Sequence, residues 1–280
     1  MATATRIFDL TAARLRRRQL RITGGTAGAS RPNFLFDLVG NDMIERLQMI
    51  RREFRSVLII GDADVGRNDT FVSQLSPNAD WTRLDPVELG EVEFLSNLAS
   101  RPESFNLALC PLGLQCVSDL PGALTLIRRS LVPDGLLLAA VIGGQSFTEL
   151  RQSMLAGEML TTAGAAPRVH PMIDVRDMGR LLLRAGFALP VADQDTLHVT
   201  YRDLLALCRD LRALGLGNIL SDRSRIPLRR DTLIAAAEHY SANFAAPDGR
   251  LKATMEIVTA MGWAPHESQQ QPLKPRGIRR

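Results

Sequence analysis

A short loop, Gly61 to Gly66, carries the first side chains of this sequence that could take part in chemistry, because it contains Asp62 and Asp64. The loop follows Val57 to Ile60, an unbroken apolar run typical of a buried parallel strand. In open α/β sheets, ligands bind at the carboxyl ends of the strands, where glycines allow close backbone approach and a following helix offers free N–H groups. The loop is therefore the first candidate for a ligand site.

Three classes of ligand compete for this loop. A phosphate-binding loop requires Lys and a hydroxyl residue where the chain has Arg67 and Asn68, and Ala63 interrupts the glycine pattern of a dinucleotide loop. The two aspartates of the loop would also repel a polyphosphate. S-Adenosylmethionine carries a sulfonium and an amino group, so it tolerates nearby carboxylates. The sequence of the loop favours this third ligand, and an ordinary strand-to-helix turn stays as the alternative.

Another acid, Asp85, ends the next predicted strand, which covers residues 81–84. An acid at this point of the fold accepts hydrogen bonds from ribose hydroxyls. With S-adenosylmethionine as the ligand, we expect contacts from the ends of three strands and from the helix that follows the second. The expected contact residues are Gly61, Asp62, Gly66, Asp85, Pro86, Phe94, Leu95 and Pro111.

Alternating strands and helices position these residues. Predicted strands cover residues 57–60, 81–84, 105–109, 136–142, 196–201 and 252–261, and predicted helices cover residues 34–54, 119–131, 174–185, 203–214 and 231–244. A sharp turn, Pro133 to Gly135, separates the second of these helices from the strand after it. The order of the elements, with strands that are apolar rather than alternating in the first half, predicts an α/β fold with a doubly wound sheet.

The composition of the 280 residues is that of a soluble globular protein, with 45% hydrophobic and 23% charged residues. A chain of this length buries enough surface to fold without disulfides or a structural metal. No apolar run approaches the ~18 residues of a membrane span. The three cysteines form no CxxC pair, and no two of the four histidines have metal-ligand spacing. We predict a reducing compartment, no metal and no membrane span.

Positive charge is concentrated at the two ends of the chain. Residues 1–60 hold 11 arginines against five acids, and the last ten residues hold four basic residues and no acid. Because the body between them is acidic and aromatic residues make up only 5% of the chain, we predict no nucleic-acid binding. The Arg-rich start is typical of a mitochondrial presequence or of a basic helix. The run Arg223 to Arg230 indicates a solvated face or contact with an acidic protein partner.

Several segments resemble a known family. Residues from Phe105 to Gly135 resemble the part of class I methyltransferases that runs from the fourth to the fifth strand. Four more segments resemble the mitochondrial complex I assembly factor 5 and its bacterial relatives; they are Gly143 to Arg151, Pro167 to Pro171, Arg184 to Phe187 and Trp263 to Gln269. Ile7 to Asp9 and the arginines after them match the start of that family's domain. The resemblance therefore favours a basic helix over a presequence.

The resemblance implies a class I methyltransferase fold, which is Rossmann-like, with a mostly parallel sheet of seven strands and helical insertions. Its implied cofactor is S-adenosylmethionine. It divides the chain into three parts. These are a basic helix and loop over residues 1–33, a methyltransferase-like domain over residues 34–268 with an inserted helical segment at 146–171, and a polar, flexible tail over residues 269–280.

The same resemblance carries an expectation about function. The mitochondrial member of the family is associated with arginine hydroxylation on a subunit of complex I, and sister families methylate the carboxylate of a malonyl carrier protein. The resemblance thus implies an S-adenosylmethionine-dependent methyltransferase-like enzyme that acts on a protein or carrier-linked substrate in complex I assembly. It implies the cytoplasm of a bacterium or, in a eukaryote, the mitochondrial matrix.

The sequence departs from the family pattern around the cofactor. Ile59 stands where an acid is usual, and Ala63 replaces a glycine. Gln115 and Cys116 replace a His-Trp pair, and Pro111 replaces a small polar residue. Loss of one charge-assisted hydrogen bond, worth ~1.5–3 kcal/mol, weakens affinity by roughly tenfold to a hundredfold. These departures support an alternative hypothesis, in which the chain is a non-catalytic assembly protein that keeps the fold with a degenerate cofactor loop.

Residues beyond the cofactor loop are candidates for contact with the substrate. No fixed catalytic residue is expected, because methyl transfer depends mainly on positioning and desolvation. His170 follows the inserted helix where a lid would lie, and a structural hydrogen bond is its alternative role. His266 follows the last predicted strand, where it would face the substrate or cap the sheet edge. The full set of substrate candidates is Arg168, His170, Tyr201 and His266.

Overall fold

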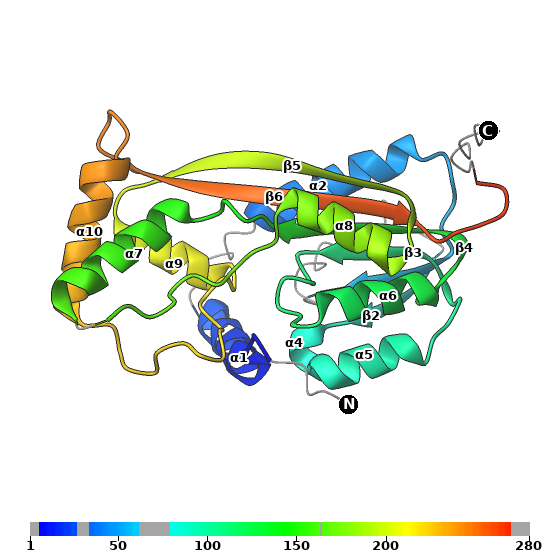
Figure 1. Cartoon of the computed structure of the whole chain (residues 1–280), viewed down its shortest axis with the longest axis horizontal. Coiled ribbons are helices and arrows are strands. Elements are labelled where there is room, and N and C mark those ends of the chain that lie inside the picture. Colours follow the sequence, from blue (N-terminus) through cyan, green and yellow to red (C-terminus); the bar gives the residue numbers. More distant parts are fainter. Residues whose placement is uncertain (1–5, 27–33, 62–78, 163, 270–280) are drawn as a thin grey trace, which may run out of the picture.

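The computed structural model describes residues 6–26, 34–61, 79–162 and 164–269, with side chains left out of the description at 21–26. The described residues form a six-stranded sheet in the order β2-β1-β3-β4-β6-β5 (Figure 1). Neighbouring strands among the first four pair in parallel, and β6 pairs antiparallel with both β4 and β5. The strands are β1 (Ser56–Ile60), β2 (Asp80–Leu84), β3 (Phe105–Pro111), β4 (Leu131–Ile142), β5 (Ala188–Tyr201) and β6 (Leu251–Trp263).

Helices cover both faces of this sheet, as a doubly wound fold requires. On one face, the buried side chains of α2 pack on β1, β3 and β4, and on the other those of α5, α6 and α8 do so. The central strands are apolar on both faces for this reason. The helices are α2 (Phe34–Met49), α5 (Glu91–Ala99), α6 (Leu120–Ser130) and α8 (Val175–Ala185). The predicted class I methyltransferase architecture is confirmed.

Within the described residues the sheet has six strands, one fewer than the seven that the family resemblance implied. The chain between β2 and β3 is described throughout, and it holds α4 (Pro86–Leu89), α5 and the short segment 100–104. Five residues are too few for a further strand with its own crossover. As a result, β2 forms the edge of the sheet.

The predicted turn Pro133 to Gly135 lies inside the bounds of β4 rather than before it. Its pairing with β3 shifts between Leu131 and Leu136, and Asp134 has a left-handed φ of 61°. The turn therefore takes the form of an irregularity within a strand that begins earlier than the sequence indicated.

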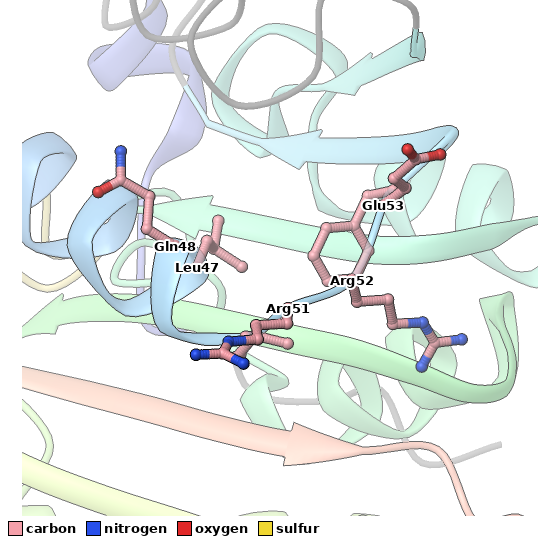
Figure 2. A pocket seen from close by; sticks show the side chains of 7 residues that line it. Leu47, Gln48, Arg51, Arg52 and Glu53 are labelled. Atoms are coloured by element: carbon pink, nitrogen blue, oxygen red, sulfur yellow. The ribbon is translucent and has the colours of Figure 1, made fainter.

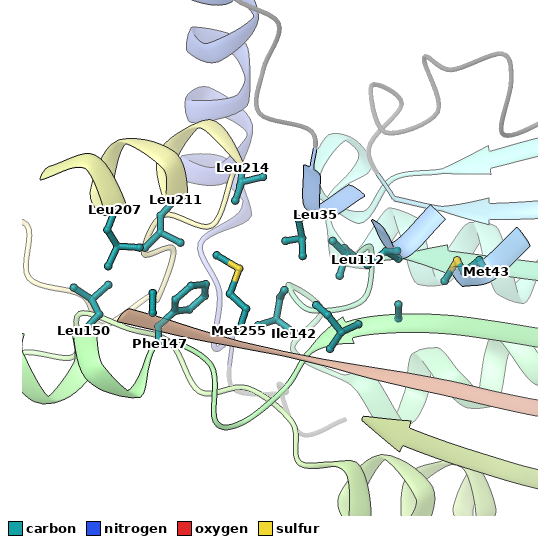
Figure 3. Packing of buried hydrophobic residues seen from close by; sticks show 14 of the residues in the cluster. Leu35, Met43, Leu112, Ile142, Phe147, Leu150, Leu207, Leu211, Leu214 and Met255 are labelled. Carbon is teal, nitrogen blue, oxygen red and sulfur yellow. The ribbon is translucent and has the colours of Figure 1, made fainter. Parts of the chain in front are cut away.

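A second group of helices lies beyond the carboxyl ends of the parallel strands, where β5 and β6 extend past the sheet (Figure 1). It comprises α7 (Thr148–Thr161), α9 (Leu204–Ala213) and α10 (Arg230–Phe244). Figure 3 shows that Leu150 of α7, Leu211 of α9 and Met255 of β6 face a common apolar interior. The predicted insertion at 146–171 contains α7 and the loop after it.

The N-terminal helix α1 (Leu10–Thr26) lies between α4 and the second helix group (Figure 1). A small apolar cluster holds it there, in which Phe8 and Ala13 pack with Val87, Cys116 and Ile219. The backbone N–H of Asp9 also donates to the carbonyl of Ile219 at 2.7 Å. The Arg-rich start of the chain is thus a helix that packs on the body of the protein. Within the described residues, no helix combines the length and apolarity needed to cross a membrane.

Candidate functional site

The ends of β1, β2 and β3 converge closely at the carboxyl edge of the sheet. Gly61 has a φ of 140°, and its N–H donates to the carbonyl of Leu84 at 3.1 Å. A Cβ on Gly61 would lie 3.3 Å from the Pro111 oxygen, and a Cβ on Gly113 would lie 2.1 Å from the Ile60 oxygen. Only glycine fits both positions. The structure therefore brings together Gly61 and Pro111, two of the residues that the sequence predicts for the cofactor.

Asp85 lies at the same edge and forms the N-cap of α4. Its Oδ1 accepts the N–H of Val87 at 2.8 Å, and its Oδ2 accepts Nη1 of Arg17 at 2.6 Å. The residue is only 7% exposed. Arg14 adds a second contact from α1, because its Nε donates to the carbonyl of Val87 at 3.1 Å. A carboxylate offers about four acceptor positions, so these two bonds leave Asp85 with capacity for another donor.

A cavity of about 680 Å³ opens between α1, the start of α4, the loop after β3 and the loop after α9, and both partners of Asp85, Arg17 and Val87, line it. Its volume lies within the ~300–1,000 Å³ of typical small-molecule sites. Its lining residues include Arg16, Arg17, Val87, Leu112, Gln115, Cys116, His170, Arg212 and Ile219. The cavity lies at the carboxyl ends of β2 and β3, where open α/β sheets bind their ligands.

The described residues that line this cavity include three arginines and no acid. Arg16 on α1 donates from Nη1 to the carbonyl of Asn218. Burial lowers the pKa of Arg16, and the nearby cations Arg223 and Arg212 lower it further, while Asp9 opposes this shift. The cavity wall on this side therefore has an excess of positive charge.

His170 is a buried polar residue of the cavity wall, with 6% of its surface exposed. Its ring packs edge-to-face on Phe8, with ring centroids 5.7 Å apart. Among the described residues, Nδ1 of His170 has no hydrogen-bond partner. Burial lowers the pKa of His170, and the charge of Arg151 adds to this effect. The imidazole is therefore neutral at pH 7 and presents an unused polar atom in the wall.

The loop after β3 lines the floor of the cavity. Leu112 has a left-handed φ of 55°, which is a strained conformation for a side chain of this size. Gln115 accepts the N–H of Ile142 at 3.4 Å, and the Cys116 thiol contacts the Gly113 oxygen at 3.7 Å. Burial raises the pKa of Cys116 to about 12, so the thiol is protonated and unreactive at neutral pH.

None of the predicted cofactor residues within the described part of the chain lines this cavity. Phe94 is fully buried in the core of the sheet, and Leu95 is half-buried against the same core. Pro86 is the first residue of α4 and is buried. Asp62 and Gly66 lie outside the described residues.

Of the four substrate candidates, His170 alone lines the cavity. Nε of Arg168 donates to Oε1 of the buried Glu158 at 2.7 Å, and the hydroxyl of Tyr201 donates to Asp210 at 2.6 Å. His266 follows β6 at the amino edge of the sheet, because β6 runs antiparallel to β4. The structure thus brings one candidate to the cavity and ties two others to side chains elsewhere.

The predicted basic run from Arg223 to Arg230 has two kinds of residue. Nη2 of Arg223 forms an ion pair with Asp9 at 2.9 Å, and this pair fixes the entry to α1. Arg225, Arg229 and Arg230 are exposed, and Arg229 pairs with Asp231 on the surface. Only part of the run therefore faces solvent.

A second hollow, of about 350 Å³, lies near the start of β1 at the opposite edge of the sheet (Figure 2). Leu47, Gln48 and Arg51 come from α2 and the turn after it, and Arg52 forms an ion pair with Asp134 at 2.8 Å. Its position at the amino ends of the strands makes it the weaker candidate for a ligand site. Within the described residues, no group of three His, Cys, Asp or Glu side chains is placed to hold a metal ion.

The fold, with a cavity at the carboxyl edge of its sheet, is that of a class I methyltransferase-like protein. No protein-family model matches the chain. The arginine-hydroxylase NDUFAF5 of Danio rerio is 32% identical over 96% of this chain and 86% of its own length, and the Homo sapiens protein is 31% identical over 98% and 82%. The chain belongs to the NDUFAF5 family, which confirms the resemblance drawn from the sequence.

Two further comparisons place the family among its neighbours. The malonyl-[acyl-carrier protein] O-methyltransferase of Halorhodospira halophila is 30% identical over 80% of this chain and 79% of its own length. The YcgJ protein of Bacillus subtilis has a solved structure that matches 82% of this chain and 99% of its own, with a TM-score of 0.51 and 12% identity. The last comparison concerns the fold alone.

Proposed function

We propose that this protein is an S-adenosylmethionine-dependent enzyme that modifies a protein or a carrier-linked substrate, with a role in the assembly of respiratory complex I. The observation that carries the proposal is the cavity of about 680 Å³ at the carboxyl ends of β2 and β3. The names of the two groups of relatives, an arginine hydroxylase and a malonyl-carrier-protein methyltransferase, supply the two kinds of substrate. We place the enzyme in the bacterial cytoplasm or the mitochondrial matrix.

Some residues at this edge of the sheet suit S-adenosylmethionine, and one does not. Gly61 lets the ends of β1 and β3 pack closely at this edge, and Asp85 keeps acceptor capacity for a ribose. Pro111 lies at the same edge. We also propose Asp62 and Gly66, from the loop after β1, as contacts of the cofactor. At the methionine end, Ile59 is buried and apolar, so the affinity should be weaker than with an acid there. When bound, the cofactor would supply an electrophilic methyl group.

The chain itself would contribute positioning and exclusion of water. Helix α1 covers the cavity and is fixed by Arg17 on Asp85 and by Arg14 on Val87. His170 would orient a polar group of the substrate from the wall, since its Nδ1 is unused. Such positioning lowers the barrier without a residue that itself reacts. The exposed arginines Arg225 and Arg230 would contact an acidic protein partner.

A specific observation also favours the non-catalytic alternative. Oδ2 of Asp85, one of the two oxygens that could accept from a ribose, already accepts from Arg17. Together with the apolar Ile59, this contact would describe an assembly protein that keeps the fold after losing its cofactor. The two functions differ in one property, which is the affinity for S-adenosylmethionine.

Calorimetric titration of the full chain with S-adenosylmethionine and S-adenosylhomocysteine decides between them. We expect binding in the micromolar range, and we expect Asp85→Ala to weaken it by about tenfold because a ribose contact is lost. Asp174→Ala is the matched control. Asp174 caps α8 in the same way, with Oδ1 accepting the N–H of Arg176 at 2.8 Å, but neither it nor Arg176 lines the cavity, whereas the two partners of Asp85, Val87 and Arg17, do. No heat and no thermal stabilisation at millimolar ligand would support the non-catalytic function.

A further inference from the structure

We propose that two copies of this protein pair through the free edge of β5, antiparallel and centred on Thr196, so that their two sheets become one continuous sheet. Strand β5 is an edge of the six-stranded sheet, because it pairs with β6 alone. Figure 1 shows it arching along the upper side of the molecule. The proposal concerns the assembly of the protein and does not depend on its enzymatic function.

The free edge of β5 is long and regular. From Val191 to Tyr201 each residue is in register with β6, and the irregularity of the strand is confined to residues 188–191. An edge strand leaves the N–H and C=O groups of every second residue without a partner in the sheet, where another strand can pair with them. In the described part of the chain, one contact outside the β5–β6 ladder reaches this backbone, a bond of 3.3 Å from Nη2 of Arg250 to the oxygen of Thr200.

The sequence of this edge lacks the features that most often prevent one strand edge from pairing with another. Natural edge strands are short, or they carry lysine, proline or a bulge where a second strand would pair. Residues 191–201 contain neither lysine nor proline, and Pro190 precedes the regular stretch. The opposite edge strand, β2, has only five residues. The edge of β5 is therefore the one suited to pairing.

Two acids of the strand, Asp193 and Asp195, determine which partner strand fits. In an antiparallel pair, side chains on the same face lie opposite each other with Cβ atoms ~4.5–5.5 Å apart, and like charges placed there are destabilising. Pairing of two copies about position 193, 194 or 195 would set acid against acid. Pairing about Thr196, the midpoint of residues 191–201, uses the whole regular stretch. It sets Asp195 opposite Leu197, so no acid lies directly opposite an acid.

The face of β5 that carries Thr196 is complementary to itself in this register. The two copies of Thr196 meet on the two-fold axis as a Thr–Thr pair, which is favourable between neighbouring strands. Gln194 of each copy lies opposite His198 of the other, and both residues are exposed in the single chain. Pairing would therefore give polar side chains that now face solvent a polar partner.

The neighbouring helices leave room for the second copy. Helix α8 packs on β5 at Ala192, since a Cβ on Gly179 of α8 would lie 3.9 Å from the Cβ of Ala192. In the proposed register Ala192 lies opposite Thr200 of the second copy, so the two α8 helices are separated by roughly 27 Å along the strands. The two-fold axis also points the carboxyl edges of the two sheets in opposite directions. Each cavity under α1 therefore stays at its own end of the dimer.

Cysteine cross-linking of the full chain tests the register. Thr196→Cys should cross-link with a short bis-maleimide, because its two copies face each other across the axis. Gln194→Cys and His198→Cys are matched controls on the same face. Each should stay monomeric on a denaturing gel, because its own copies lie roughly 13 Å apart along the strands, but a mixture of the two variants should cross-link. The wild-type chain, with its cysteines buried or half-buried, gives the background.

Sedimentation velocity tests the dimer itself. We expect the wild-type chain to dimerise at micromolar concentration, and Thr196→Lys should raise the dissociation constant at least about tenfold, because two lysines meet on the axis. Within one chain this lysine would lie opposite Glu256 of β6, so it should not disturb the fold, and circular dichroism checks this. Gln194→Lys adds the same charge two residues away and should leave the constant within about threefold, because its copies lie beyond a Debye length of each other.

Three results would overturn the proposal. A chain that stays monomeric at every concentration would mean that the edge of β5 is free or pairs with an extended segment of another protein. A dimer that Thr196→Lys does not weaken would use a different surface. Cross-linking of Gln194→Cys alone, without cross-linking of Thr196→Cys, would mean a different register. Cofactor binding is measured separately, so its outcome does not affect this test.

Discussion

Two buried carboxylates in this protein each accept from an arginine, but their surroundings give them different roles. Glu158 on α7 accepts Nε of Arg168 on one oxygen and the N–H of Ala166 on the other, and its side chain is 4% exposed. Asp85 accepts the N–H of Val87 and the guanidinium of Arg17, and both of these partners line a cavity of about 680 Å³. The first pair joins a helix to the loop after it. The second holds α1 at the carboxyl edge of the sheet, where this kind of fold binds ligands.

The largest effect is expected at the first pair, Arg168 and Glu158. We expect Arg168→Ala to lower the free energy of unfolding by roughly 3 kcal/mol, because it leaves the Glu158 charge buried without its partner. Urea denaturation followed by circular dichroism measures this loss. Arg180→Ala, which removes an arginine 78% exposed and paired with Asp177, should change it by less than about 1 kcal/mol. Unchanged stability together with a loss of substrate binding would contradict this structural role and would support the prediction that Arg168 contacts the substrate.

The second pair should respond in ligand affinity more than in stability. Arg17→Gln frees Oδ2 of Asp85, and we expect S-adenosylmethionine to bind about tenfold more tightly, equivalent to about 1.4 kcal/mol. Calorimetry of the variant measures the change. Arg14→Gln is the control, since it removes a neighbouring contact of α1 on Val87 and leaves the Asp85 pair intact. Weaker cofactor binding in Arg17→Gln would mean that Arg17 supports the cofactor site instead of obstructing it.

The fold was predictable because its signals are local and strong. The run Leu136 to Ile142 is apolar without interruption and is fully buried within β4. The helix expected at 174–185 has Asp174 as its N-cap and Gly186 in the left-handed conformation after its last turn. Side-chain period, capping residues and glycines act over a few residues, so one sequence contains them. The number of strands was wrong because it came from the family and not from the segment 100–104.

The site was predictable only where it depends on strand ends. Gly61, Asp85 and Pro111 follow predicted strands, and parallel strands bring such residues to one edge. Arg16 and Arg212 were missed, because their meeting depends on how α1 and α9 pack on the body. His266 lies at the other edge, since the apolar pattern of residues 252–261 identifies a strand without giving its direction. Sequence spacing cannot show either kind of long-range relation.

The smallest expected effect concerns His170, which contrasts with both pairs because its buried polar atom has no partner. We expect His170→Leu to leave the free energy of unfolding at pH 7.5 unchanged or to raise it by up to about 1 kcal/mol, because no hydrogen bond is lost. The advantage of the variant should grow as the pH falls. The pKa of His170 is lowered in the folded state by burial and by Arg151, so below the unfolded value of about 6.5 the unfolded chain binds the extra proton.

Urea denaturation between pH 7.5 and pH 5 separates the two causes. The wild-type protein should lose a component of stability as the pH falls through this range, and His170→Leu and His170→Gln should both lack it, because neither titrates there. Only the leucine variant should also gain stability at pH 7.5, since glutamine keeps a polar group in the wall. A loss of more than about 1 kcal/mol in His170→Leu would show that Nδ1 holds the fold together. In that case Nδ1 of His170 would have a structural role in the cavity wall. His170 would then no longer differ from Asp85, whose carboxylate has partners within the fold.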